Sequence, residues 1–453
     1  MGTVGLSFGS ATSGAGFDVA STVTQILAVQ QSIETPWKTQ LALLKSQDTI
    51  FTTLGSDLSA LSTSLRALTD FSGVMSQKQG SSSDANVLSL TAANPAAIAG
   101  SHTVVVTSLA QISSQYSDTV TNAADVLSGS ITIQVGLGAS QTVTVDSSSN
   151  TLATLAAAIN TAGIGATASV ISDTKGSRLS VVSSTGGAAG ALTVSSALSD
   201  DTTSAALAFK VGQTGVDAQL TVDGVALTSA TNKVSTAIPG VTFQLLSVSA
   251  SPIQVEITND NSAVETALTA VVSAYNAVLK DIKTQEGKDS TGAAEPLYGS
   301  PTLALIQSQL NAALLGGAAS GAITNITQLG ISAGQDGTLT LDSTTLESAL
   351  DNNFLDVTGF LQNTGGFGQI MATTLNSLGV DSIQGAVYLA QQENTAQEAS
   401  LNKNVSDQEA RIAVQKASLT TELNLANQIL QSIPTQLDSF DKLYSAITGY
   451  NAK

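Results

Sequence analysis

The residues that could carry covalent or acid–base chemistry are few in this chain. It has no cysteine and a single histidine, His102, among 453 residues. Thiol nucleophiles, disulfides and thiolate metal sites are therefore excluded, and a zinc site would lack its usual ligands. His102 stands at the start of a predicted strand and has no nucleophile or second histidine beside it. A solvated or hydrogen-bonded strand residue therefore explains it better than a catalytic base.

Three other patterns invite a chemical interpretation, and each has a simpler structural one. "GQDGTLTLD" places Asp336 and Asp342 near a glycine, but it lacks the alternating ligand positions of a calcium loop, so it is predicted to be a turn or hairpin. "VGLGAS" lacks the complete glycine pattern of a phosphate loop. No pair of acids stands out as the two carboxylates that a glycosidase needs. We therefore predict no catalytic residue, no cofactor and no metal site.

Charge and composition narrow the possible partners. The 34 acidic and 16 basic residues give a net charge of −18, without a basic cluster that could neutralise phosphates, so nucleic acid is not expected as a partner. Only 11% of residues are charged, against about 25% in a typical soluble chain. The apolar runs are shorter than the roughly 18 residues that span a bilayer, so no membrane insertion is expected. The N-terminal sequence lacks the features of a cleaved secretory signal.

The elements that position these residues begin with two predicted helices. Asp18 could cap the first, and Thr35 followed by Pro36 marks the start of the second, which runs to about Phe71. Within it, "FTTLGSDLSALSTSLRAL" carries two rows of apolar residues spaced by seven, as in a coiled-coil seam. The seam consists of Phe51, Leu54, Leu58, Leu61, Leu65 and Leu68.

The C-terminal tract, from about Gln392, carries a second seam with the same spacing. Its residues include Leu419, Leu423, Leu430, Ile433, Leu437, Phe440, Tyr444 and Ile447. The natural partner of the first seam is this last one, which predicts an antiparallel helical stem. Pro434 lies inside the tract and is expected to kink or end the helix.

Between the two helical ends the period of the sequence changes from seven to two. Short runs rich in Val, Thr and Ile alternate with Gly, Ser and Asn, which predicts strands, and "TLATLAAAIN" predicts one short helix among them. The fold class is therefore α+β and multidomain, with an antiparallel coiled-coil stem formed by the two chain ends and β-rich heads inserted between them. The expected divisions are 1–42 with 421–453 as terminal helical segments, 43–82 with 261–420 as a helical leg, 83–130 with 215–260 as one head, and 131–214 as a second head.

Several blocks resemble one family in the same order along the chain. The N-terminal "GFDVASTVTQILAVQQSIETPWKTQLALLKSQ" resembles the start of the bacterial flagellar filament-cap family, also called the second hook-associated proteins. "TLATLAAAINTAGIGATASVISDTKGSRLSVVSS" is similar to an insert found in such axial proteins. "LTVDGVALTSATNKVSTAIPGVTFQLL" and "SLNKNVSDQEARIAVQKASL" resemble the C-terminal half of the family.

The resemblance implies a secreted, non-enzymatic protein at the tip of the bacterial flagellum. Such proteins form a homo-oligomer, of about five subunits in the family, that retains exported flagellin and promotes its folding and insertion. The implied partners are flagellin, further copies of the chain, a hook–filament junction protein and an export chaperone of the type III route. We expect the end that docks into the filament to comprise Val19, Val23, Ile26, Ile33, Ile433, Leu437, Phe440, Tyr444 and Ile447.

Other functions are compatible with the same elements. A surface adhesin with β-rich binding heads on a helical stalk would use residues 87–260 to bind glycans, independently of any filament. A different axial protein, flagellin or a junction protein, is disfavoured by "DGVALTSATNKVSTAIPGVTFQLL". A peptidoglycan hydrolase carried on an axial protein is the remaining alternative.

Overall fold

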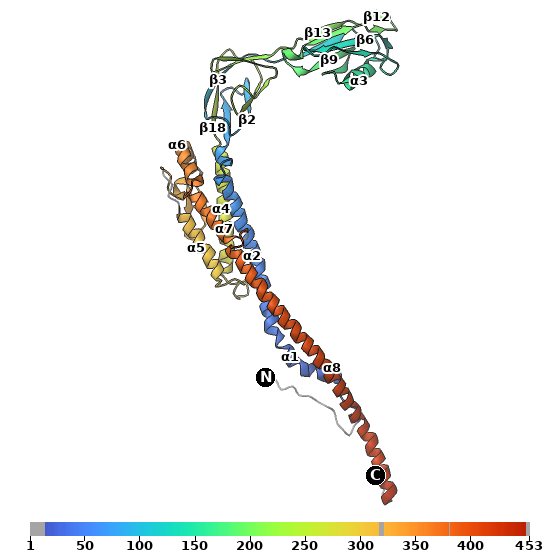
Figure 1. Cartoon of the computed structure of the whole chain (residues 1–453), viewed down its shortest axis with the longest axis vertical. Helices are drawn as coiled ribbons and strands as arrows, with labels where there is room; N and C mark the ends of the chain where they lie inside the picture. Colours follow the sequence, from blue (N-terminus) through green and yellow to red (C-terminus); the bar gives the residue numbers. More distant parts are fainter. Residues whose placement is uncertain (1–13, 317–320, 380, 450–453) are drawn as a thin grey trace. The chain divides into compact units, whose positions relative to one another are not determined.

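The computed structural model describes residues 14–316, 321–379 and 381–449 of the chain. It consists of two compact units, a helical unit of residues 1–69 and 265–453 and a strand unit of residues 70–264. Each unit is described by itself below, with the element labels of Figure 1. The mixed helix and strand composition predicted from the sequence is confirmed.

The helical unit contains the long helices and one small hairpin. Its helices are α1 (Val19–Gln31), α2 (Glu34–Thr69), α4 (Asn261–Gln285, whose first residues belong to the strand unit), α5 (Pro301–Leu315), α6 (Ser343–Gln362), α7 (Phe367–Leu378) and α8 (Ala386–Thr448). A 3-10 turn, η3 (Ile326–Leu329), precedes the hairpin of β19 (Ile331–Ala333) and β20 (Leu339–Leu341). The hairpin confirms the turn predicted at Asp336–Gly337.

Local sequence signals explain where the first two helices begin. The Asp18 carboxylate accepts a hydrogen bond from the Ser21 backbone N–H at 3.1 Å and caps α1 as predicted. The second helix begins at Glu34, one residue before the predicted cap at Thr35. Pro36 then lies in the first turn, where its missing N–H has no intrahelical acceptor to lose.

Helix α8 runs antiparallel to α1 and α2 within the helical unit (Figure 1). The direction follows from hydrogen bonds in which the residue number rises on α2 and falls on α8. Lys38 binds Glu409 at 2.9 Å, the Asn394 amide donates to Asp48 at 2.8 Å, and the Gln391 amide donates to Thr52 at 3.1 Å.

Two predictions about the C-terminal half are corrected by the structure. Helix α8 is continuous from Ala386 to Thr448 and passes through Pro434 instead of ending there. Because this part of the helix is largely exposed, water can satisfy the Leu430 carbonyl that the missing proline N–H leaves free. Helices α6 and α7 were also not predicted from the sequence. Asp342 accepts from the Thr344 N–H and caps α6, a signal that the hairpin prediction had assigned to a turn.

One described helix, α4, is long and apolar enough to cross a membrane by length and composition. Its buried apolar residues recur at the spacing of one helix face, for example Leu268, Val271, Tyr275, Val278 and Ile282. Polar residues such as Asn276 and Lys280 lie between them and are not buried. This pattern is that of an amphipathic helix that packs in the core of a helical unit.

The strand unit contains two apolar cores. The first lies between a five-stranded sheet and a three-stranded sheet. The larger sheet has the order β1 (Lys78–Ser82), β18 (Ile253–Asn259), β3 (Gly100–Ser108), β14 (Ala218–Val222) and β15 (Val225–Ser229). The smaller has the order β16 (Lys233–Val234), β17 (Val241–Leu245) and β2 (Leu88–Ala93). A 3-10 turn, η1 (Val74–Ser76), precedes β1.

The second core is covered by the predicted short helix, α3 (Leu152–Ala162), and by three further sheets. The four-stranded sheet has the order β13 (Phe209–Gln213), β4 (Ile112–Ser117), β9 (Gly176–Gly186) and β8 (Ala166–Asp173). One three-stranded sheet has the order β10 (Leu192–Ser196), β6 (Ser130–Val135) and β7 (Gln141–Thr144). The other has the order β12 (Ala205–Ala206), β11 (Ser199–Asp200) and β5 (Leu127–Ser128). A 3-10 turn, η2 (Ala188–Gly190), follows β9. Val120 and Leu127, which the sequence analysis placed in the other head, belong to this core.

Strand β4 turns polar side chains toward the second core, which no hydrophobic pattern could have predicted. Ser113, Gln115 and Ser117 are buried. Ser113 accepts a hydrogen bond from the Leu192 N–H at 2.9 Å, and the Gln115 amide donates to the Leu192 carbonyl at 2.7 Å. These side chains therefore satisfy backbone groups of β10, which lies in another sheet.

Candidate protein-interaction site

The first predicted seam forms the interior of the helical unit. Its six residues, Phe51, Leu54, Leu58, Leu61, Leu65 and Leu68, are each at most 3% exposed. Leu61, Leu65 and Leu68 line a small cavity of about 20 Å³ together with residues of α4 and α7, among them Val271 and Met371. This part of the seam is therefore used inside the chain and is not available to a partner.

The structure gives the two seams different partners from those predicted. Leu419 and Leu423 of α8 pack against a cluster of buried residues from α1 and α8: Val19, Val23, Leu27 and Ile412. Leu430 is half-buried. The cause is the length of α8: with Gln391 already opposite Thr52, the residues near 420 lie opposite α1 rather than opposite Phe51–Leu68.

The residues expected to dock into the filament fall into two groups. On the N-terminal side, Val19 and Val23 are buried against α8, Ile26 is half-buried and Ile33 is exposed. On the C-terminal side, Ile433 is half-buried, whereas Leu437, Phe440, Tyr444 and Ile447 are 50% to 76% exposed. The C-terminal part of α8 therefore presents an apolar stripe that the described residues do not cover.

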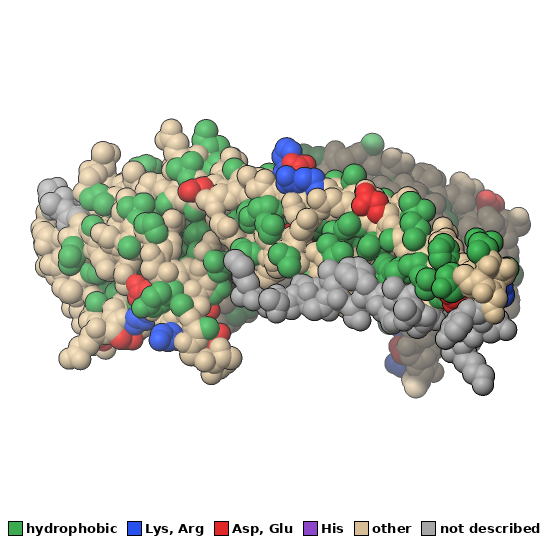
Figure 2. Space-filling model, turned by 90° about the horizontal axis from the view of Figure 1, so that it is seen from below, with side chains coloured by type: hydrophobic (Ala, Val, Ile, Leu, Met, Phe, Trp, Pro, Cys, Tyr) green, Lys and Arg blue, Asp and Glu red, His purple; other side chains and the backbone are tan. Residues whose placement is uncertain are grey.

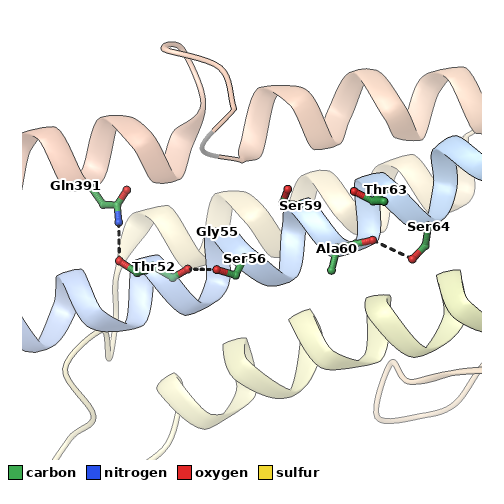
Figure 3. Close-up of a pocket in the computed structure, with 8 residues that line it drawn as sticks. All are labelled: Thr52, Gly55, Ser56, Ser59, Ala60, Thr63, Ser64 and Gln391. Carbon is green, nitrogen blue, oxygen red and sulfur yellow. Dashed lines mark hydrogen bonds between the residues drawn. The ribbon is translucent and has the colours of Figure 1, made fainter.

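A groove follows the outer face of α2, where the side chains are small (Figure 3). It has a volume of about 770 Å³ and is lined by Thr52, Gly55, Ser56, Ser59, Ala60, Thr63, Ser64 and Gln391. Gln391 reaches across from α8 to Thr52, and the other labelled residues all belong to α2. Only the apolar seam of this helix was predicted from the sequence, and this groove was not.

Carboxylates from two helices meet inside the helical unit. Burial raises the pKa of Asp57 on α2 above its ordinary value, and a hydrogen bond to Asp281 on α4 and the charge of that residue raise the pKa further. Elsewhere charges are sparse: the face of the molecule in Figure 2 is mostly uncharged polar and apolar, with acidic and basic side chains scattered across it.

The residues weighed for chemistry have structural roles. His102 lies on β3, and its Nδ1 is 2.7 Å from the Asp223 carboxylate. This hydrogen bond lowers the pKa of Asp223, which occupies a left-handed turn with φ +48° before Gly224. Asp336 accepts from the Thr338 hydroxyl and N–H within its turn. Among residues 14–316, 321–379 and 381–449, no group of three or more acidic, His or Cys side chains is placed to hold a metal.

Comparison with known proteins identifies the family. Residues 15–113 match the family described as "Flagellar hook-associated protein 2 N-terminus", and residues 215–434 match its "C-terminus" counterpart. The B-type flagellar hook-associated protein 2 of Pseudomonas aeruginosa is 30% identical over 449 residues, which cover 91% of this chain and 94% of that protein. The chain belongs to the flagellar hook-associated protein 2 family.

Two further relatives agree with this assignment. The flagellar hook-associated protein 2 of Escherichia coli K12 is 30% identical over 361 residues, or 74% of this chain and 76% of that protein. The crystal structure of domains D1–D3 of the flagellar cap protein FliD from Escherichia coli matches with a TM-score of 0.59 at 28% identity, covering 76% of this chain and 99% of that one. The function of this chain is therefore that of a flagellar filament cap, outside the cell at the flagellum.

Proposed function

We propose that this chain is one subunit of an oligomeric cap that retains exported flagellin at the filament tip and promotes its folding and insertion. The observation that carries the proposal is the exposed apolar stripe of α8, from Leu437 to Ile447. Soluble chains seldom leave a row of large apolar side chains uncovered without an interaction that buries it. In a cap protein, the filament end is the surface that this stripe would meet.

The same proposal gives the helical unit the role of a stem and leg. Helices α1, α2 and α8 would act as an antiparallel coiled-coil stem, supported by the hydrogen bonds of Lys38 to Glu409 and of Asn394 to Asp48. The strand unit would supply the heads, one around each of its two apolar cores. The docking end would comprise α1 and the part of α8 after about residue 421.

The proposed partners follow from this role. They are flagellin, further copies of the chain in a ring of about five subunits, a hook–filament junction protein and an export chaperone. Neither nucleic acid binding nor membrane insertion is part of the proposal, since the chain is acidic and the apolar residues of α4 pack within the chain. The cap would act by holding and positioning flagellin, without catalysis of its own.

Deletion of the gene in its own organism tests the proposal. We expect abundant soluble flagellin in the culture medium and few or no filaments, with filaments restored when the protein is supplied. Normal filaments and intact motility in the deletion strain would contradict the proposal. That result would favour the adhesin hypothesis, in which the heads bind glycans independently of a filament.

A further inference from the structure

A buried carboxylate lies where α1 gives way to α2. Glu34 is the first residue of α2 and is 5% exposed. One of its oxygens, Oε2, accepts from the Lys38 ammonium at 2.8 Å. The other, Oε1, is buried and has no hydrogen-bond partner among the residues that the structure describes. A buried carboxylate in this state depends on its single cation, because an uncompensated buried charge is strongly unfavourable.

Lys38 joins this carboxylate to α8. Its ammonium also binds the Glu409 carboxylate at 2.9 Å, so one cation serves two anions on two helices. One residue earlier on α8, the buried Gln408 amide donates to the Gln30 carbonyl at the end of α1 at 3.4 Å. Two polar contacts therefore hold the junction of α1 and α2 against α8.

The rest of α1 is held by one small apolar cluster and by a contact at its other end. The helix has 13 residues, which is near the length at which an isolated helix is marginal in water. Its apolar contacts with α8 form a small cluster around Val19, Val23 and Leu27. The N–H of Phe17 donates to Asn427 at 2.9 Å at the other end. A short helix attached through one small cluster opens at a lower free energy than the larger core of the unit.

We propose that Glu34, Lys38 and Glu409 form an ionic latch that controls the release of α1 from α8. With the latch closed, Val19 and Val23 are covered; when it opens, they and the α8 residues beneath them become available to a partner. The latch is a property of the free chain. Its use during docking rests on the proposed function.

Amide hydrogen exchange of the full chain, followed by mass spectrometry, tests the latch. Lys38→Met keeps most of the apolar side chain but leaves Glu34 buried without its cation. We expect amides of residues 19–31 to exchange at least about tenfold faster, while those of residues 51–68 keep the wild-type rate. The double variant Lys38→Met/Glu34→Gln removes the buried charge as well but still lacks the bridge to Glu409, so its exchange in residues 19–31 should stay faster than wild type, by a smaller factor than in Lys38→Met.

A matched control uses a surface ion pair on α8. Lys403 binds Asp407 at 2.7 Å, and both side chains are exposed, so Lys403→Met should leave exchange in α1 unchanged. Unchanged exchange in Lys38→Met would overturn the latch. Wild-type exchange in the double variant, or loss of protection in residues 51–68, would also overturn it, since the effect would then come from the buried charge of Glu34 alone or from general destabilisation. These outcomes are independent of the gene deletion, so the latch and the proposed function can fail separately.

Discussion

At the scale of single residues, burial distinguishes the leucines that stabilise the fold from those that remain exposed to solvent. Leu61 is 1% exposed and lines the small cavity between α2, α4 and α7. Leu425 of α8 carries the same side chain but is 60% exposed. The two leucines stand in helices with similar heptad spacing, and burial alone distinguishes them.

Leu61→Ala is expected to destabilise the helical unit by about 2–5 kcal/mol, because it removes buried methyl groups and enlarges an existing cavity. Leu425→Ala is the control and should change the free energy of unfolding by less than about 0.5 kcal/mol. Chemical denaturation of the two variants beside the wild type measures both values. A similar loss in both variants would contradict the assignment of Leu61 to the core.

Polar residues inside the α8 interface show what residue patterns could not predict. Val387, Asn394, Leu401 and Gln408 are spaced by seven and are all buried, so two of four core positions are polar. Because Asn394 and Gln408 are polar, this row does not stand out as an apolar heptad. The apolar spacing instead pointed to the later seam of Leu419, Leu423 and Leu430. Buried polar residues in a coiled coil fix its register at a cost in stability. The spacing of apolar residues alone therefore could not predict which helix packs against each seam.

At the scale of elements, α2 and α4 meet through a pair of acids. The raised pKa of Asp57 means that the folded state holds its proton more tightly than the unfolded chain does. The protonated Asp57 therefore contributes to the stability of the folded state. This contribution is complete below the ordinary aspartate pKa of about 3.9, and it is lost as the pH rises through the raised pKa of the folded state. At neutral pH the two carboxylates repel each other across the helix pair.

Asp57→Asn removes this repulsion. We expect the Tm of the variant to exceed that of the wild type by about 1–2 °C near pH 7 and the difference to vanish below about pH 3, where Asp57 is protonated in both states. Thermal unfolding at several pH values measures this. Asp438→Asn is a control, because Asp438 pairs with Lys442 on the exposed part of α8. A Tm difference for Asp57→Asn that is independent of pH would contradict the coupling to Asp281.

The elements themselves were predictable to different degrees, for physical reasons. Helices α1 and α2, the short helix α3 and most strands follow from caps and from periods of seven and two. Helices α6 and α7 escaped prediction because glycines divide their sequence into short pieces and because the capping signal at Asp342 was assigned to a turn. The continuity of α8 through Pro434 depends on solvent exposure, which the sequence does not give.

At the scale of the whole molecule, α8 changes its role along its length. Before Pro434 its buried residues face α1 and α2, although Leu389, Val414, Leu425 and Ile429 of this part are exposed. After Pro434 the apolar residues are uncovered, and Phe440 is 69% exposed. Such a division fits a helix that is anchored in its own chain at one end and contacts an assembly at the other, because binding orders and covers surface that folding leaves open.

Phe440→Asp tests this division of α8. Because Phe440 is exposed, the substitution should change the free energy of unfolding by less than about 0.5 kcal/mol, yet it places a charge in the stripe that we propose docks into the filament. We therefore expect the variant to be exported but to restore few filaments in the deletion strain. Val414→Asp, at an equally exposed site before Pro434, is the matched control and should restore filaments fully. Filament counts, Tm and the amount of each variant in the medium distinguish a docking defect from a folding or export defect. Full restoration by Phe440→Asp would show that the end of α8 does not dock through this stripe.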